Sequence, residues 1–201
     1  YGDNGRFINP TDYDDSLNFL YAALSTNNYL RWNNPQSGSS FTPVRVPQIT
    51  AQVSAVTVSP NVIRRVYFGS SNGRIVRVDS ADIDTVRNGT HLNNGVAGFT
   101  NYVNCIEVEK GNENHIIAIQ SNYGVSNIWE TKNGGTSWTA CDGNLPDMPV
   151  RWILLNPSKP WQAIIATELG VWSTDSLRGA TTDWQPSNAG LANTRCTMLK
   201  L

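Results

Sequence analysis

The sequence has no stretch of apolar residues long enough to cross a membrane as a helix. Its longest apolar runs, such as residues 163–167, have the length of a strand, whereas a membrane helix needs about 20 residues. An excess of charge of one sign is also missing, because 15 Lys and Arg residues stand against 16 Asp and Glu residues. We therefore expect no membrane span, and the lack of a basic stripe argues against nucleic acid as a partner.

Histidine and cysteine are scarce. The two histidines, His91 and His115, and the three cysteines, Cys105, Cys141 and Cys196, form no cluster along the sequence. Metal sites and catalytic triads need such residues in definite groups, and a phosphate-binding Gly-rich loop is missing as well. We predict no cofactor and no metal, and we interpret the cysteines as small residues of the core.

Helical periodicity is lacking apart from a possible short turn near residues 81–86, and a repeat stands in its place. Apolar runs end at Pro10, Pro60 and Pro157, and Lys110 holds the corresponding place in the remaining unit. These positions are 50, 50 and 47 residues apart. A period of just under 50 residues is typical of one β-propeller blade.

Each unit contains further strand-like runs separated by turn residues. The second runs are at 19–23, 66–69, 115–119 and 163–167, and the third runs are at 29–32, 75–78, 126–129 and 171–173. Turns between them contain Gly73, Gly124 and Gly170, and a fourth strand is expected to end near Trp138 and Trp184. Short β-rich runs between Gly, Pro and Asn indicate antiparallel hairpins.

These patterns predict an all-β fold, a β-propeller fragment of about four four-stranded blades plus the first strand of a fifth. The predicted blades cover approximately residues 5–50, 51–101, 102–148 and 149–193, with the next blade from 194, all in one propeller domain over 1–201. A right-handed β-solenoid is the alternative, but its repeats are shorter.

Residues 131–138 read Thr-Lys-Asn-Gly-Gly-Thr-Ser-Trp and resemble the Asp-box, a hairpin signature of sialidases, xyloglucan-degrading hydrolases and sortilin-type receptors. Asn stands where Asp is usual. The resemblance implies a structural hairpin on the face opposite the active site of those families, with its Trp packed between blades. A stretched version follows in the fourth unit. The assigned residues are Thr131, Asn133, Gly135, Ser137 and Trp138 in the third unit, and Ser173, Asp175 and Trp184 in the fourth.

Short segments along nearly the whole chain are similar to those of large propeller proteins that Bacteroidota secrete through the type IX system. Examples are residues 66–69, 143–150 and 166–172. This resemblance implies a secreted or outer-surface location and a larger polypeptide. Four Asp-Ser/Thr-apolar triplets also match the O-glycosylation acceptor of that phylum, with acceptor hydroxyls on Ser16, Ser80, Thr85 and Ser176. Such dipeptides also simply favour turns, so both interpretations stay open.

Aligning the first strands places Ser54, Asn104, Arg151 and Arg195 in one column at the start of each strand, beside the mouth of the central channel. Propellers bind ligands at that mouth, and two arginines suit a carboxylate, sulfate or sugar acid. The alternative is that the arginines pair with Asp147 or cap loop carbonyls. The predicted ligand-binding set is Asn104, Arg151, Arg195, Glu168, Asp147 and Tyr123.

No catalytic residue is assigned, because the sequence shows no recognisable catalytic set. We predict a non-catalytic surface or secreted propeller that acts as a scaffold, adhesin or glycan- or protein-binding module of a larger polypeptide. Its expected partners are the remaining blades of the same protein or another protein chain, and glycans. The alternative is a sialidase- or xyloglucanase-like glycoside hydrolase with catalytic residues partly outside this segment, and a sortilin-like peptide-binding channel is a third possibility.

Overall fold

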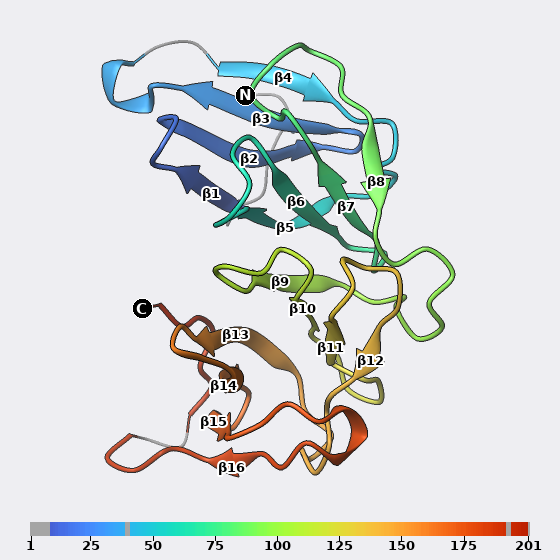
Figure 1. Cartoon of the computed structure of the whole chain (residues 1–201), viewed down its shortest axis with the longest axis vertical. Coiled ribbons are helices and arrows are strands. Elements are labelled where there is room, and N and C mark those ends of the chain that lie inside the picture. The colour runs from blue at the N-terminus through green and yellow to red at the C-terminus, as the bar shows by residue number, and fades with distance from the viewer. Residues whose placement is uncertain (1–8, 39–40, 192–193, 201) are drawn as a thin grey trace.

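The computed structural model describes residues 9–38, 41–191 and 194–200. They form four antiparallel four-stranded sheets that follow one another from the blue to the red end of the chain (Figure 1). Blade 1 contains β1 (Thr11–Asp14), β2 (Phe19–Ser25), β3 (Asn28–Asn33), the 3-10 turn η1 (Pro35–Ser37) and β4 (Phe41–Arg45). Blade 2 contains β5 (Val53–Val58), β6 (Val66–Ser70), β7 (Ile75–Val78) and β8 (Gly89–His91).

Blade 3 contains β9 (Val103–Val108), β10 (Ile116–Gln120), β11 (Ile128–Thr131) and β12 (Thr139–Ala140). Blade 4 contains β13 (Val150–Asn156), β14 (Lys159–Thr167), β15 (Gly170–Thr174), the 3-10 turn η2 (Gly179–Thr181) and β16 (Gln185–Pro186). No helix in the described part of the chain is long and apolar enough to cross a membrane.

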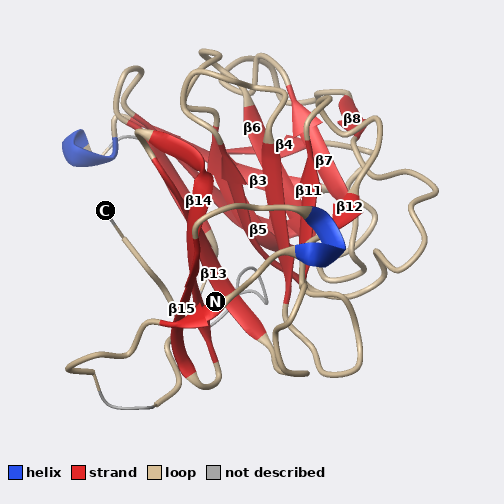
Figure 2. Ribbon diagram, turned by 60° about the horizontal axis from the view of Figure 1, so that its bottom comes forward, coloured by secondary structure: helices blue, strands red, loops and turns tan. Residues whose placement is uncertain are grey.

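The first strands of the four sheets lie side by side. β1 contacts β5, β5 contacts β9, and β9 contacts β13, while each sheet continues outward in chain order. Sheets that share one inner edge in this way are the blades of a propeller, as predicted. Figure 2 shows the strands running between two ends that carry the loops. We call the end where the first strands begin the proximal end, and the end where they turn into the second strands the distal end.

The core lies between successive blades, as three clusters of buried apolar side chains. Tyr29 of blade 1, for example, stacks on Phe68 of blade 2 with ring centroids 4.8 Å apart. Both faces of the middle blades are covered, which explains why their strands are nearly continuous in apolar residues. Cys105 and Cys141 are buried free thiols of this core, but Cys196 is only half-buried and lies outside the three clusters.

The first strand of blade 1 lies later in the chain than the repeat predicts. The strand was expected at 7–10, of which 7 and 8 lie outside the described residues, yet β1 follows Pro10. The reason lies in the turn that ends the strand. Asp14 Oδ1 accepts the backbone N–H groups two and three residues on, and Ser59 Oγ does the same in blade 2. The equivalent of Ser59 is therefore Asp14, because a side-chain acceptor closes this turn with or without a proline.

Other strand ends also differ from the prediction. β11 begins two residues later than expected, and β12 and β16 begin just after Trp138 and Trp184 instead of ending there. Residues 194–200 pass the proximal end, where Cys196 N–H donates to the Thr167 carbonyl at 2.9 Å, but pair with no strand among the described residues. The first strand of a blade pairs with its own second strand, and the described residues hold no second strand of a fifth blade.

Candidate functional site

A β-bulge interrupts the pairing of the first and second strands at the proximal end of three blades. The extra residue is Ser54 in β5, Asn104 in β9 and Arg151 in β13. A bulge bends the strand and re-aims the side chain of its extra residue. The three residues of the predicted column therefore occupy corresponding positions, and the bulge explains how they leave the sheet.

The first two bulge residues bind the next blade. Ser54 Oγ donates to the Val103 carbonyl at 2.6 Å, and Asn104 Nδ2 donates to the Arg151 carbonyl. These carbonyls belong to first strands, which pair on one edge with their own second strand and on the other edge with no strand of their sheet. The bonds thus satisfy backbone groups that the sheets leave unpaired. Asn104 thus uses one amide N–H to join blade 3 to blade 4.

Arg151 pairs with Glu168, at the end of β14, and not with Asp147. The pair is half-buried, and Glu168 is held in turn by its own N–H, which donates to the Pro149 carbonyl at 3.2 Å. Arg151 Nε is buried and has no hydrogen-bond partner among the described residues. The prediction that Asp147 neutralises this arginine is therefore wrong, because the bulge directs the guanidinium along its own blade.

Asp147 holds the neighbouring loop instead. Its Oδ1 accepts the Gly124 N–H at 2.7 Å, which positions Tyr123 on the surface with 65% of the residue exposed. Arg195 is exposed and precedes Cys196, which binds the backbone of β14 next to Glu168. The structure thus brings all six predicted residues to the proximal end of blades 3 and 4. Tyr123 and Arg195 are the two that are exposed to solvent and whose side chains form no hydrogen bond or ion pair with another described residue.

A second set of inter-blade bonds lies three residues further along the inner strands, and sequence reasoning missed it. Asp12 Oδ2 accepts the Val58 N–H at 2.7 Å, and Thr57 Oγ1 donates to the Ile106 carbonyl at 2.8 Å. In the next blade, the carboxylate of Glu107 accepts the Leu155 N–H at 3.4 Å. The sequence feature that indicates these bonds is a polar residue three positions after Ser54 and after Asn104, namely Thr57 and Glu107.

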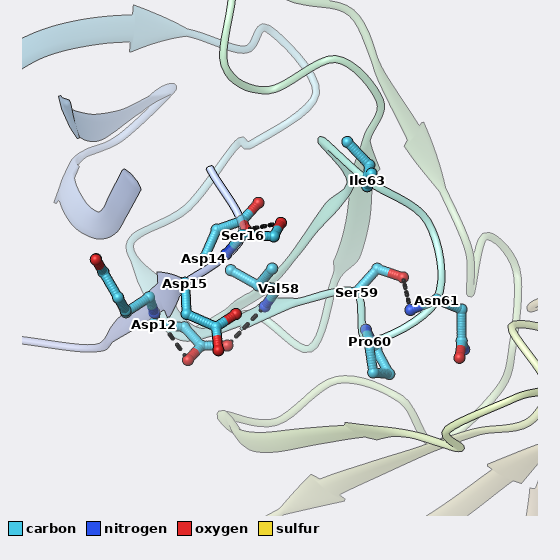
Figure 3. A pocket seen from close by; sticks show the side chains of 10 residues that line it. Asp12, Asp14, Asp15, Ser16, Val58, Ser59, Pro60, Asn61 and Ile63 are labelled. Atoms are coloured by element: carbon cyan, nitrogen blue, oxygen red, sulfur yellow. Dashed lines mark hydrogen bonds between the residues drawn. The ribbon is translucent and has the colours of Figure 1, made fainter. Parts of the chain in front are cut away.

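Two depressions open at the distal end, with volumes of about 350 and 320 Å³. Both are lined by Asp12, Val58 and Pro60, and Figure 3 shows the first, where Ser16 lies on the rim. Burial raises the pKa of Asp12, and burial likewise raises the pKa of Glu107, in the second depression, to about 7. Each carboxylate is bound to a backbone N–H of the next blade.

The four predicted O-glycosylation acceptors all lie in distal loops. Ser16 is in the β1–β2 turn, Ser80 and Thr85 are in the β7–β8 loop, and Ser176 is in the β15–β16 loop. Ser16 and Thr85 are exposed, whereas Ser80 and Ser176 are half-buried. Any sugar on them would stand at the end opposite Tyr123.

The 131–138 hairpin of blade 3 closes through its own side chains. Thr131 Oγ1 accepts the Gly135 N–H at 3.0 Å, and Asn133 Oδ1 accepts the Ser137 N–H at 2.9 Å. The hairpin then directs Trp138 to blade 2, where the indole N–H donates to the Leu92 carbonyl at 2.9 Å. The amide of Asn133 thus accepts the backbone bond that a carboxylate would accept at this position.

In blade 4 the corresponding residues are shifted by one. Thr174, the last residue of β15, accepts the Ser176 N–H with its hydroxyl at 3.2 Å. Ser173 instead binds the Ser187 hydroxyl, and Asp175 accepts the Gln162 amide, so neither closes the hairpin as predicted. The strand register decides this, because Ala163 faces Thr174 across the sheet just as Ile116 faces Thr131 in blade 3. Trp184 keeps its predicted role as an inter-blade side chain.

No family model matches the sequence, and a search of curated proteins found no match either. Solved structures are similar, however. Against the Niastella koreensis GH74 enzyme the TM-score is 0.64 at 18% identity, covering 88% of this chain and 29% of that one. Against YCF48 from Cyanidioschyzon merolae the TM-score is 0.59 at 14% identity, covering 81% of this chain and 48% of that one. Against the β-propeller domain of Cps50 (Swd1) from Myceliophteria thermophila the TM-score is 0.63 at 10% identity, covering 100% of this chain and 61% of that one.

The fold is that of a β-propeller. The identities with these structures are 10–18%, so the similarity extends to the fold alone. The chain spans between 29% and 61% of the length of these three solved chains.

Proposed function

We propose that the chain is part of a non-catalytic propeller module that binds a glycan or a protein at its proximal end, within a larger secreted or surface polypeptide. The observation that carries the proposal is that the two carboxylates of the predicted proximal set are already bound within the protein. Glu168 pairs with Arg151, and Asp147 accepts a backbone N–H, so both carboxylates are engaged. Acid–base chemistry on a sugar requires carboxyl groups that face the substrate.

The remaining proximal groups suit binding. Tyr123 offers an exposed aromatic ring, and Arg195 offers an exposed guanidinium that forms no ion pair with any described residue. A guanidinium binds carboxylate or sulfate through two parallel hydrogen bonds, and an aromatic ring adds contact area at little entropic cost. An acidic or sulfated glycan therefore fits best.

A glycan array probed with the 201-residue chain tests this. We expect binding to acidic or sulfated glycans that weakens about tenfold in Arg195→Ala, the loss of one charge-assisted contact, and to a similar extent in Tyr123→Ala. Tyr13→Ala is the matched control, since Tyr13 is an exposed tyrosine outside the proximal set. Equal losses in Tyr13→Ala and Tyr123→Ala, or no glycan bound at all, would contradict the proposal.

The proposal of a larger polypeptide is supported by the outer flank of blade 1. Tyr13, Leu20, Trp32 and Phe41 face one another across all four strands of blade 1, on the side away from blade 2. Phe41 is 58% exposed and Tyr13 39%. The corresponding faces of the other blades pack on a neighbour, so further blades are the expected occupants.

Intact mass spectrometry of the native protein, before and after deglycosylation, tests the larger polypeptide and the distal sugars together. A mass well above 22.1 kDa that falls on deglycosylation is the expected result. A bare mass of 22.1 kDa would contradict both the further blades and the use of the four acceptor sites.

A glycoside hydrolase is the second candidate, favoured by one observation. Glu107 has a pKa of about 7 and lines a depression that it shares with Asp12, and a carboxyl group with such a pKa can act as a general acid. Hydrolysis of xyloglucan or sialosides by the chain, abolished in Glu107→Gln and Asp12→Asn, would favour this candidate. We expect no turnover with any of the three proteins.

A further inference from the structure

His115, just before β10, lies between two carboxylates. Its Nδ1 is 2.7 Å from Glu109 Oε2, and its Nε2 is 2.9 Å from Glu130 Oε1. The histidine side chain is 7% exposed, so little of the ring is open to water. A neutral imidazole carries one N–H and can donate to only one of two ionised carboxylates. With both carboxylates ionised, the two contacts therefore require the doubly protonated ring.

The groups around the ring come from three elements. Glu109 follows β9 and also accepts the Asn112 amide at 3.2 Å. Glu130 lies in β11, where the Lys132 ammonium is 3.3 Å away, and Cys141, just after β12, donates its thiol at 3.7 Å. Two carboxylates thus face one ammonium and one imidazole, and their charges balance only when the imidazole is positive.

The electrostatics agree with that arrangement. Burial alone lowers the pKa of His115, but the hydrogen bonds to Glu130 and Glu109 outweigh burial and raise the pKa above its usual value. Burial raises the pKa of Glu130, but His115 and Lys132 outweigh this and lower it. Both directions favour an imidazolium beside an ionised Glu130 carboxylate.

Glu109 begins the β9–β10 turn of blade 3, which contacts blade 2 at the distal end. The Glu109 carbonyl accepts the Asn61 amide at 2.8 Å, and Asn61 Oδ1 accepts the Gly111 N–H at 2.6 Å. At the other end of the turn, the Glu113 carboxylate accepts the Ser59 hydroxyl at 2.8 and 2.9 Å. The position of the 109–113 turn therefore decides how blades 2 and 3 meet at this end.

We propose that protonated His115 is a pH-sensitive latch, which fixes the Glu109 side chain at the start of the 109–113 turn and loosens this turn against blade 2 when the ring loses its proton. With one N–H left, the other ring nitrogen and its carboxylate face each other with lone pairs only. One of the two carboxylates must then move away from the ring. Movement of the Glu109 carboxylate removes the contact that fixes the first side chain of the turn, while the Glu109 N–H still donates to the His115 carbonyl at 3.0 Å.

The direction follows from the raised pKa of the folded state. The latch stabilises the fold fully below the unfolded pKa of about 6.5, and its contribution is lost as the pH rises through the higher pKa of folded His115. The released proton passes to solvent. This device lies at the distal end and is independent of ligand binding at the proximal end.

Nitrogen NMR of the ¹⁵N-labelled imidazole in the 201-residue chain is the first test. We expect both ring nitrogens to show imidazolium shifts at pH 6, with one titration step whose midpoint lies above pH 6.5. A neutral tautomer at pH 6 would overturn the proposal, because one carboxyl would then carry the proton. Glu130→Gln removes one negative charge and should lower the pKa of His115, and an unchanged pKa would also contradict the latch.

Amide hydrogen exchange, corrected for the intrinsic effect of pH, tests the release. The protection of Gly111, whose N–H binds Asn61, should fall at least tenfold across the His115 titration, while Ser71 of blade 2, bound to the Gln52 carbonyl, should stay protected. His115→Gln should abolish the pH step, whereas Glu113→Gln should weaken protection at every pH and keep the step. Protection of Gly111 in the wild type that does not change as His115 titrates would overturn the proposal. This measurement uses the wild-type chain and does not depend on any variant folding.

Discussion

The indole of Trp184 donates its N–H to the carbonyl oxygen of Cys141, 2.9 Å away in the preceding blade. Trp138 makes the same bond to Leu92 one blade earlier, also at 2.9 Å. Both tryptophans leave the hairpin that follows a third strand, and Trp184 is completely buried. A large ring with one donor thus packs each of these blades on its predecessor and satisfies a backbone carbonyl.

Replacing Trp184 separates its packing from its hydrogen bond. We expect Trp184→Phe to lower the free energy of unfolding by about 1–3 kcal/mol, since the Cys141 carbonyl loses its donor, and Trp184→Ala by about 3–5 kcal/mol. Urea denaturation measures both values, and Trp161→Phe, at an exposed tryptophan, is the control. Similar small losses in all three variants would show that Trp184 does not hold the blades together.

The inner-strand bonds predict a measurable loss from one hydroxyl. Thr57→Val keeps the shape of the side chain but leaves the Ile106 carbonyl without its donor, so we expect a loss of about 1–2 kcal/mol. Thr11→Val at an exposed position of β1 should change stability by less than about 0.5 kcal/mol. If denaturation gives the same value for both variants, the Thr57 bond contributes nothing net.

Glu107 makes stability depend on pH. Burial raises its pKa from 4.5 to about 7, so the folded chain binds more protons than the unfolded chain between these values. The free energy of unfolding should therefore fall as the pH rises from about 4.5 to about 7. Glu107→Gln should flatten this slope in urea titrations at several pH values. An unchanged slope would mean that Glu107 ionises normally in the fold.

Gly143 is a position where the backbone leaves no room for a side chain. A Cβ there would lie 1.8 Å from the Thr182 carbonyl oxygen, whereas a Cβ at Gly95 would meet nothing within 4 Å. Both glycines have a positive φ, of 53° and 78°, so the conformational strain of an alanine is similar. We expect Gly143→Ala to lower the free energy of unfolding by about 1–3 kcal/mol more than Gly95→Ala, as measured by thermal denaturation. Equal losses in the two variants would contradict the close approach.

The sequence by itself determined the number and order of the blades and most of the strands. Apolar runs such as 66–69 are local signals, because a strand covered on both faces needs apolar residues on both sides. Turn glycines such as Gly124 and Gly170 are local signals too, since each has a positive φ in the structure. The inter-blade tryptophans were also recognisable, because Trp184 and Trp138 stand at fixed places within their units.

Only the tertiary structure decided how polar side chains are paired. The sequence pattern misplaced the first strand of blade 1 and assigned Ser173 and Asp175 to a hairpin that Thr174 closes. It also missed that Glu168 neutralises Arg151. Hydrogen bonds between blades, such as that from Thr57 to Ile106, join residues about 40 to 50 positions apart. A bulge or a one-residue change of register also redirects a side chain to another partner. Such partners depend on the packing of whole blades, which no local stretch of sequence specifies.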